Sequence, residues 1–133
     1  MSDLIKYVNQ EILRKALNLK YTVADLAPQT EIELFNSSSL VIWSGASDNT
    51  IYGDCKVNWA FRALHDALHL KTRFNFDVDS EIELGRLQAC QFDSDLMREL
   101  IFCEVSLQAA HFKKTGHFVN DQVSFTKQHL NLK

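Results

Sequence analysis

Two histidines with an aspartate between them are the residues of this chain best suited to chemistry. His65, Asp66 and His69 lie in the stretch VNWAFRALHDALHL, which spans residues 57–70. Its three leucines and three alanines favour a helix. Residues four positions apart point the same way on a helix, so His65 and His69 can offer their imidazoles to one ion. The sequence therefore predicts a divalent metal site on this helix, with zinc as the expected ion.

Two further residues of this helix could act on a substrate. Asp66 follows His65 directly and could take a proton from a water molecule that the metal activates. Arg62 lies about one turn before His65 and could neutralise an anionic group of the substrate. The leading hypothesis is a metal-dependent hydrolase with a small-molecule or peptide substrate. The bond that it would cleave, phosphoester or peptide, is left open.

A zinc site of this kind needs a third protein ligand, and two carboxylates later in the chain are candidates. Glu81 lies near the start of the next expected helix, on the same side as Gly85 and Gln88. Glu104 lies among apolar residues, where an unpaired carboxylate would be costly. Either glutamate could complete the site, and the other could take the water proton in place of Asp66. The sequence leaves the choice between them open.

A polar stripe accompanies the second of these glutamates. Glu104, Gln108 and His111 follow one another at helical spacing on an otherwise apolar segment. The stripe could simply face solvent. Alternatively it faces the histidine pair, in which case Gln108 and His111, together with Gln88, would support the metal ligands or contact the substrate.

Apolar periodicity, capping residues and turn residues predict the elements that must hold these side chains. Residues 77–80 offer a helix cap, within which Ser80 and Glu83 fit a capping box, and Gly116 is the expected end of a long helix. The predicted fold is mainly α: a small helical bundle with a short β-hairpin in the first half, α+β at most, in a single domain of residues 1–133. The expected helices cover residues 2–19, 57–70, 80–91, 95–115 and 119–130, and the expected strands cover residues 30–35 and 40–43.

The composition argues against several partners and locations. The chain has 133 residues and a net charge of −3, so no basic face is expected for a nucleic-acid duplex. No apolar run approaches the roughly 18 residues that a membrane span needs. The cysteines have no CxxC spacing and the N-terminus is too charged for a signal peptide, which predicts a cytoplasmic protein. Association into a homo-oligomer through apolar helix faces stays open.

Part of the chain resembles a group of small uncharacterised proteins of tailed phages. The resemblance covers residues 50–125 and implies that His65, His69, Glu81 and Glu104 belong together, in a host cytoplasm. It is carried by the sequence WAFRALHDALHL, by Glu81, Gly85, Arg86, Leu87 and Gln88, by Glu104 and Gln108, and by GHFVNDQ.

The histidine helix also resembles two families of metal enzymes. Its HDxxH pattern is similar to the HExxH of zincin metallopeptidases, with an acid one methylene shorter. That resemblance implies that Asp66 is the general base and that Glu81 or Glu104 is the downstream ligand. The adjacent His65 and Asp66 resemble the signature of the HD-domain phosphohydrolases, which are all-helical and bind divalent metals. A further histidine on an earlier helix of that family has no counterpart, because His65 is the first histidine of this chain.

A non-catalytic protein is the alternative hypothesis. It would be a phage-type accessory or inhibitor protein that binds a host protein or a small nucleotide. The polar, turn-rich segment SGASDNTIYG at residues 44–53 would then make the contacts, and the histidines would serve as hydrogen-bonding residues of the helix.

Overall fold

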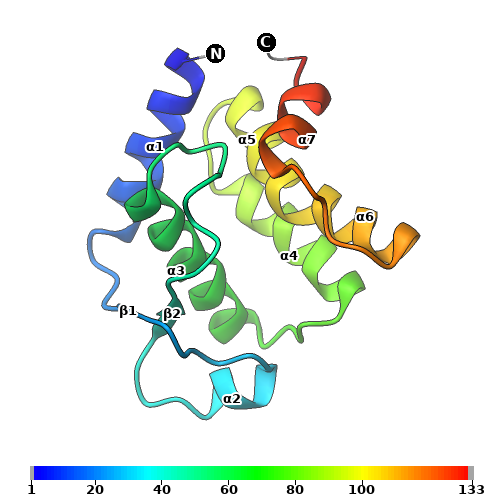
Figure 1. The fold of residues 1–133 in the computed structure, drawn as a ribbon. Helices are drawn as coiled ribbons and strands as arrows, with labels where there is room; N and C mark the ends of the chain where they lie inside the picture. The colour runs from blue at the N-terminus through cyan, green and yellow to red at the C-terminus, as the bar shows by residue number, and fades with distance from the viewer. Residues whose placement is uncertain (1, 132–133) are drawn as a thin grey trace. The chain divides into compact units, whose positions relative to one another are not determined.

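The computed structural model describes residues 2–131, and most of them are helical (Figure 1). The prediction of a mainly α fold is confirmed. No helix within the described part of the chain is long and apolar enough to cross a membrane. In chain order the elements are α1 (Ser2–Ala16), β1 (Thr22–Ala24), α2 (Glu31–Phe35), β2 (Val41–Trp43), α3 (Cys55–Thr72), α4 (Val78–Cys90), α5 (Asp95–Phe102), the π-helical turn η1 (Cys103–Leu107), α6 (Gln108–Thr115) and α7 (Gln122–His129).

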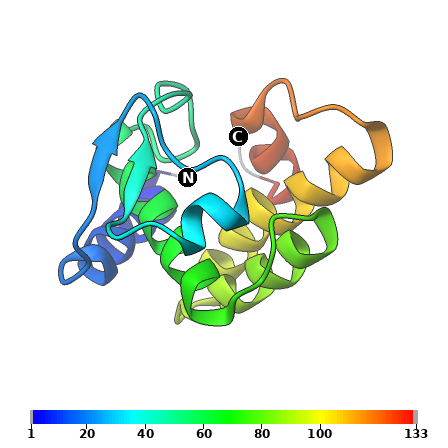
Figure 2. The same ribbon diagram turned by 90° about the horizontal axis from the view of Figure 1, so that it is seen from below.

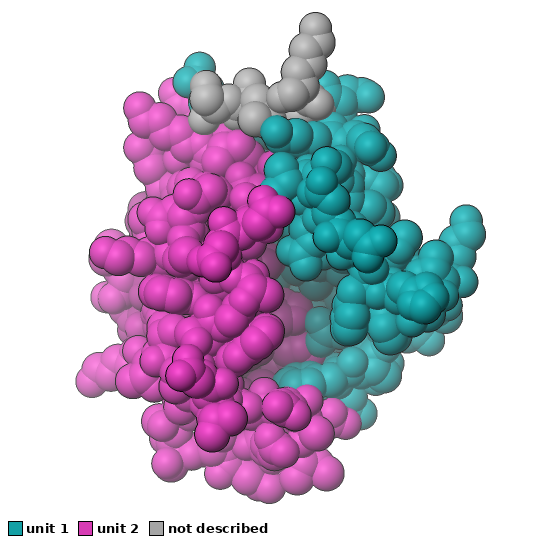
Figure 3. Space-filling view, viewed as in Figure 1, with its two compact units in different colours: residues 1–4, 74–133 teal, residues 5–73 magenta. Residues whose placement is uncertain are grey.

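The chain divides into two compact units (Figure 3). The N-terminal unit consists of residues 5–73, and the C-terminal unit consists of residues 1–4 and 74–133. The division describes how the chain packs, and the prediction of a single domain stays a prediction.

The β element of the N-terminal unit differs from the predicted hairpin. β1 and β2 pair in parallel, with Val23 opposite Ile42, and Figure 2 shows the two strands side by side. Parallel neighbours need a crossover connection, and residues 25–40 supply it through α2. The strand expected at residues 40–43 is present as β2, but its partner is Thr22–Ala24 rather than residues 30–35.

The expected strand at residues 30–35 is a helix, and the reason is local. The side chain of Thr30 accepts a hydrogen bond from the N–H of Glu33, which caps the first turn of α2. Leu34 is buried whereas Ile32 is 68% exposed, so only one of the two alternating apolar residues is in the core. The alternation of Glu31 to Leu34 therefore does not mark a strand with one buried face.

In the C-terminal unit, α4 packs against α5, η1 and α6, and η1 also packs against α7. Gly85 allows α4 to come close to η1. A Cβ atom at Gly85 would lie 2.1 Å from the hydroxyl oxygen of Ser106 and 2.8 Å from Cβ of Val105. Ser106 in turn donates a hydrogen bond of 2.6 Å to the carbonyl of Ile82.

The helix expected at residues 95–115 is present but is interrupted by η1, which the sequence pattern does not reveal. Its end at Gly116 is confirmed, because Gly116 has a φ of 75° and its N–H donates to the carbonyl of Phe112. The cap of α4 is Asp77 rather than Ser80, since the Asp77 carboxylate accepts the N–H of Ser80 at 3.0 Å.

Candidate metal centre

α3 holds the two histidines on a well-anchored helix. The Asp54 side chain caps its first turn by accepting the N–H of Lys56 at 2.8 Å. Arg73 ends it in the left-handed conformation, with φ 62°, and donates its N–H to the carbonyl of His69. The face that points into the core is apolar apart from Asn58 and His69, and its other buried residues are Val57, Ala60, Phe61, Ala63 and Leu68.

His65 and His69 lie against each other one helical turn apart. Their ring centroids are 4.8 Å apart, and the rings meet edge to face at 88°. His69 is 1% exposed, whereas His65 is half-buried. An imidazole buried to this degree needs partners for its ring nitrogens, and a shared ion can be one of them.

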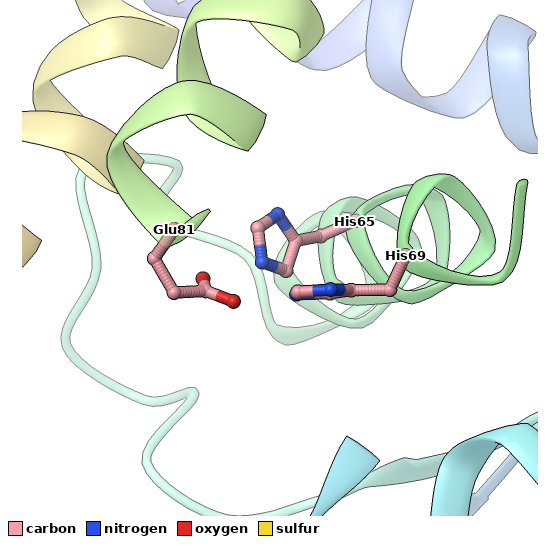
Figure 4. Close-up of side chains that lie close together, drawn as sticks. All are labelled: His65, His69 and Glu81. Atoms are coloured by element: carbon pink, nitrogen blue, oxygen red, sulfur yellow. The ribbon is translucent and has the colours of Figure 1, made fainter. Parts of the chain in front are cut away.

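Glu81 completes a group of three with this pair (Figure 4). One ligand atom from each of His65, His69 and Glu81 lies within 4.8 Å of the others, and the group could hold a metal ion. Imidazole nitrogens and a carboxylate oxygen are ligands that zinc takes at about 2.0–2.2 Å.

The donor set also suits a catalytic metal. Two imidazoles and one carboxylate are a ligand set that zinc uses in hydrolytic sites, where the fourth position stays open for water. Glu81 lies in the first turn of α4, and the Asp77 cap fixes where that helix begins. Only residues 73–77 connect α3 to α4, so the third ligand follows the histidine helix closely in the chain.

Arg62 and Asp66 lie on the same helix, but Arg62 has contacts of its own. Its guanidinium donates to the carbonyls of Trp43 at 2.7 Å and Gly45 at 2.5 Å, and it lies 5.3 Å from the centre of the Trp43 ring. Burial lowers the pKa of Arg62, and the charge of Asp66 opposes that shift. These contacts tie β2 and the segment after it to α3. A role for Arg62 or Asp66 toward a substrate stays a prediction.

Glu104 lies in a different environment. Its Oε2 accepts a hydrogen bond from the amide of Gln108, and its Oε1 is buried without a hydrogen-bond partner. Burial raises the pKa of Glu104 to about 7, although hydrogen bonds from Gln108 and Thr126 oppose the shift. Within residues 2–131, Glu81 and not Glu104 belongs to a metal-ligand group with the histidines.

The other predicted supporting residues are also placed. Gln88 is 1% exposed in α4, and the ring of His111 packs edge to face against Phe125 at 5.7 Å. Gln108 makes the bond to Glu104 and also lines a cavity of about 380 Å³ in the C-terminal unit. The stripe of Glu104, Gln108 and His111 thus contacts the rest of its own unit through each of its members.

That cavity was not foreseen from the sequence. Glu81 lines it together with three phenylalanines and two glutamines, namely Phe76, Phe112, Phe118, Gln108 and Gln122. Phe118, one of these phenylalanines, is 78% exposed. An aromatic residue followed by a polar segment, as in GHFVNDQ, is the one sequence signal that could have indicated it.

No protein-family model matches the sequence, and no curated protein or solved structure is significantly similar to it.

Proposed function

We propose that this protein is a metal-dependent hydrolase whose ion is held by His65, His69 and Glu81. The observation that supports the proposal is the group of two imidazoles and one carboxylate, with ligand atoms within 4.8 Å of one another. Zinc is the ion we expect, because the donor set is nitrogen-rich and contains one hard oxygen ligand.

The chemistry follows from an ion with one open coordination position. Such an ion lowers the pKa of a bound water from about 15.7 to about 7 and polarises the bond to be cleaved. Asp66, next to His65, is the proposed acceptor of the water proton. Its carboxylate is on the same helix as both histidines, so α3 would position two ligands and the base together.

Metal analysis of untagged protein tests the binding step. We expect about one zinc ion per chain for the wild type and less than about 0.2 for His65→Ala and for Glu81→Gln. His111→Ala and Glu104→Gln are the matched controls, since each removes the same kind of group from outside the cluster. Equal metal content in the wild type and His65→Ala would overturn the proposal.

Hydrolysis tests the reaction step. The loaded protein would be assayed with a phosphodiester and with a peptide ester, each carrying a nitrophenol leaving group. Asp66→Asn should keep its zinc and lose activity by about 100-fold or more, as removal of a general base does. Bound zinc without turnover of either substrate would favour the alternative of a non-catalytic accessory protein.

A further inference from the structure

We infer that the cavity lined by Glu81 binds a nucleobase, which makes a nucleoside or nucleotide the ligand class of this protein. The inference starts from the cavity walls, all of which belong to the C-terminal unit. A volume of about 380 Å³ lies at the lower end of the range of small-molecule sites and suits one or two fused rings rather than a polymer.

The aromatic wall supplies a stacking surface. Phe112 and Phe118 lie with ring centroids 4.7 Å apart and planes tilted by 35°. Phe118 remains 78% exposed in spite of this contact. An apolar ring that borders a cavity and is still open to solvent is what a stacking ligand would cover, and stacking on an aromatic side chain does not depend on which base is bound.

The polar wall selects among flat ligands. Gln108 and Gln122 both line the cavity, and an amide pairs with a base edge through one donor and one acceptor. Gln108 already gives an N–H to Glu104, so its carbonyl oxygen is directed away from that carboxylate. An unsubstituted phenyl ring in the same place would bury these amides without partners, which is unfavourable.

The charge of the cavity wall favours the base of a nucleotide over its phosphate. Among the described residues that line the cavity, Glu81 is the only charged one. A phosphate is therefore excluded from the cavity itself and a neutral base is favoured. If the ligand is a nucleotide, its phosphate would bind the ion held by Glu81, and that placement rests on the function proposed above. Binding of the base depends on the cavity alone.

Saturation-transfer NMR on the full chain tests base binding without metal. The probes are adenosine, guanosine, cytidine and uridine, each in EDTA, and N-acetylphenylalanine amide is the comparison ligand. We expect saturation of the base protons of at least one nucleoside and at least about tenfold weaker binding of the phenylalanine derivative. No saturation of any nucleoside, or stronger binding of the phenylalanine derivative, would overturn the inference.

Variants locate the binding. Phe118→Ala should weaken the best nucleoside by about 5- to 100-fold through loss of stacking, and Gln122→Leu by about tenfold. Gln128→Leu is the control, because Gln128 is exposed on the same helix α7 and does not line the cavity. Val119→Trp, which fills the cavity, should abolish binding. Unchanged binding in both Phe118→Ala and Val119→Trp would contradict the assignment.

The two proposals fail separately. His65→Ala should still bind the nucleoside in EDTA, because that variant removes a metal ligand and leaves the cavity wall intact. Nucleoside binding without zinc binding would refute the metal centre and keep this inference. Zinc binding together with saturation of only the phenylalanine derivative would support the metal centre and refute nucleobase binding.

Discussion

Glu81 and Glu104 are two glutamates that end in contrasting environments. Both stand in predicted helices after the histidine pair, and both were candidates for the third metal ligand. Glu81 is in the first turn of α4 and shares a ligand group with His65 and His69. Glu104 is in η1, bonded to Gln108, with one oxygen buried and unpaired.

The contrast shows that the partners of a carboxylate decide what it can do. Grouped with two imidazoles, the Glu81 carboxylate is suited to bind a cation. Next to an amide and apolar side chains, Glu104 has a pKa raised to about 7 by burial, so a proton rather than a metal is its natural partner. Each of the following predictions would break or sharpen this distinction.

The largest difference should appear in metal affinity. Glu81→Gln should weaken zinc binding by more than about 1,000-fold, because even loss of a residue that only supports a ligand costs up to about 100-fold. Glu104→Gln should leave the affinity within about twofold. Competition with a fluorescent zinc chelator measures both. Equal losses in the two variants would mean that the distinction between these glutamates is wrong.

The next largest effect is the pH dependence that Glu104 gives to the stability of the protein. Its pKa rises from an ordinary 4.5 to about 7 in the folded protein, so the folded state binds this proton more tightly than the unfolded chain. The stabilisation is complete below pH 4.5 and is lost as the pH rises through about 7.

Glu104→Gln should remove this dependence. Compared with the wild type, the variant should gain up to about 3 kcal/mol of unfolding free energy between pH 5 and pH 8. Urea unfolding at several pH values measures the difference. Parallel stability curves for wild type and variant would show that Glu104 is ionised at little cost.

A smaller effect is expected at the contact between α4 and η1. Gly85→Ala would put a methyl group 2.1 Å from the Ser106 hydroxyl and 2.8 Å from Val105. The resulting overpacking should cost about 1–3 kcal/mol of unfolding free energy. Ser106→Ala combined with Gly85→Ala should recover part of the loss. An unchanged urea midpoint for Gly85→Ala would show that α4 and η1 leave room for the added methyl group.

The smallest expected effect concerns two helix caps that make the same hydrogen bonds. Asp77 and Asp121 each accept a serine N–H at 3.0 Å and a serine hydroxyl at 2.8 Å, at the starts of α4 and α7. Replacing either with Ala should lower the melting temperature by about 3 °C. Only Asp77→Ala should also weaken zinc binding, because the capped turn carries Glu81. Identical zinc affinities in the two variants would show that this cap does not position the ligand.

The sequence predicts local features well, and it leaves choices between distant residues open. The helix of His65 and His69 and the end at Gly116 each depend on neighbouring residues, and both are present. The parallel pairing of β1 with β2 depends on a crossover through α2, whose single turn looks like an alternating strand.

The choice between Glu81 and Glu104 was out of reach for a different reason. Both satisfy the rule that a carboxylate should follow the histidine pair on a helix. The decisive facts are the amide of Gln108, which bonds Glu104, and the π-helical turn that changes the side-chain spacing at Cys103–Leu107. Neither a hydrogen bond of this kind nor a local widening of the helix is encoded in hydrophobic periodicity.

Anomalous diffraction at the zinc edge is the most direct test of the central claim. Crystals of the untagged full chain grown with one equivalent of zinc should show one strong anomalous peak, about 2.0–2.2 Å from a ring nitrogen of His65, a ring nitrogen of His69 and a carboxylate oxygen of Glu81. A peak at Glu104, or none within about 4 Å of the histidine rings, would contradict the account.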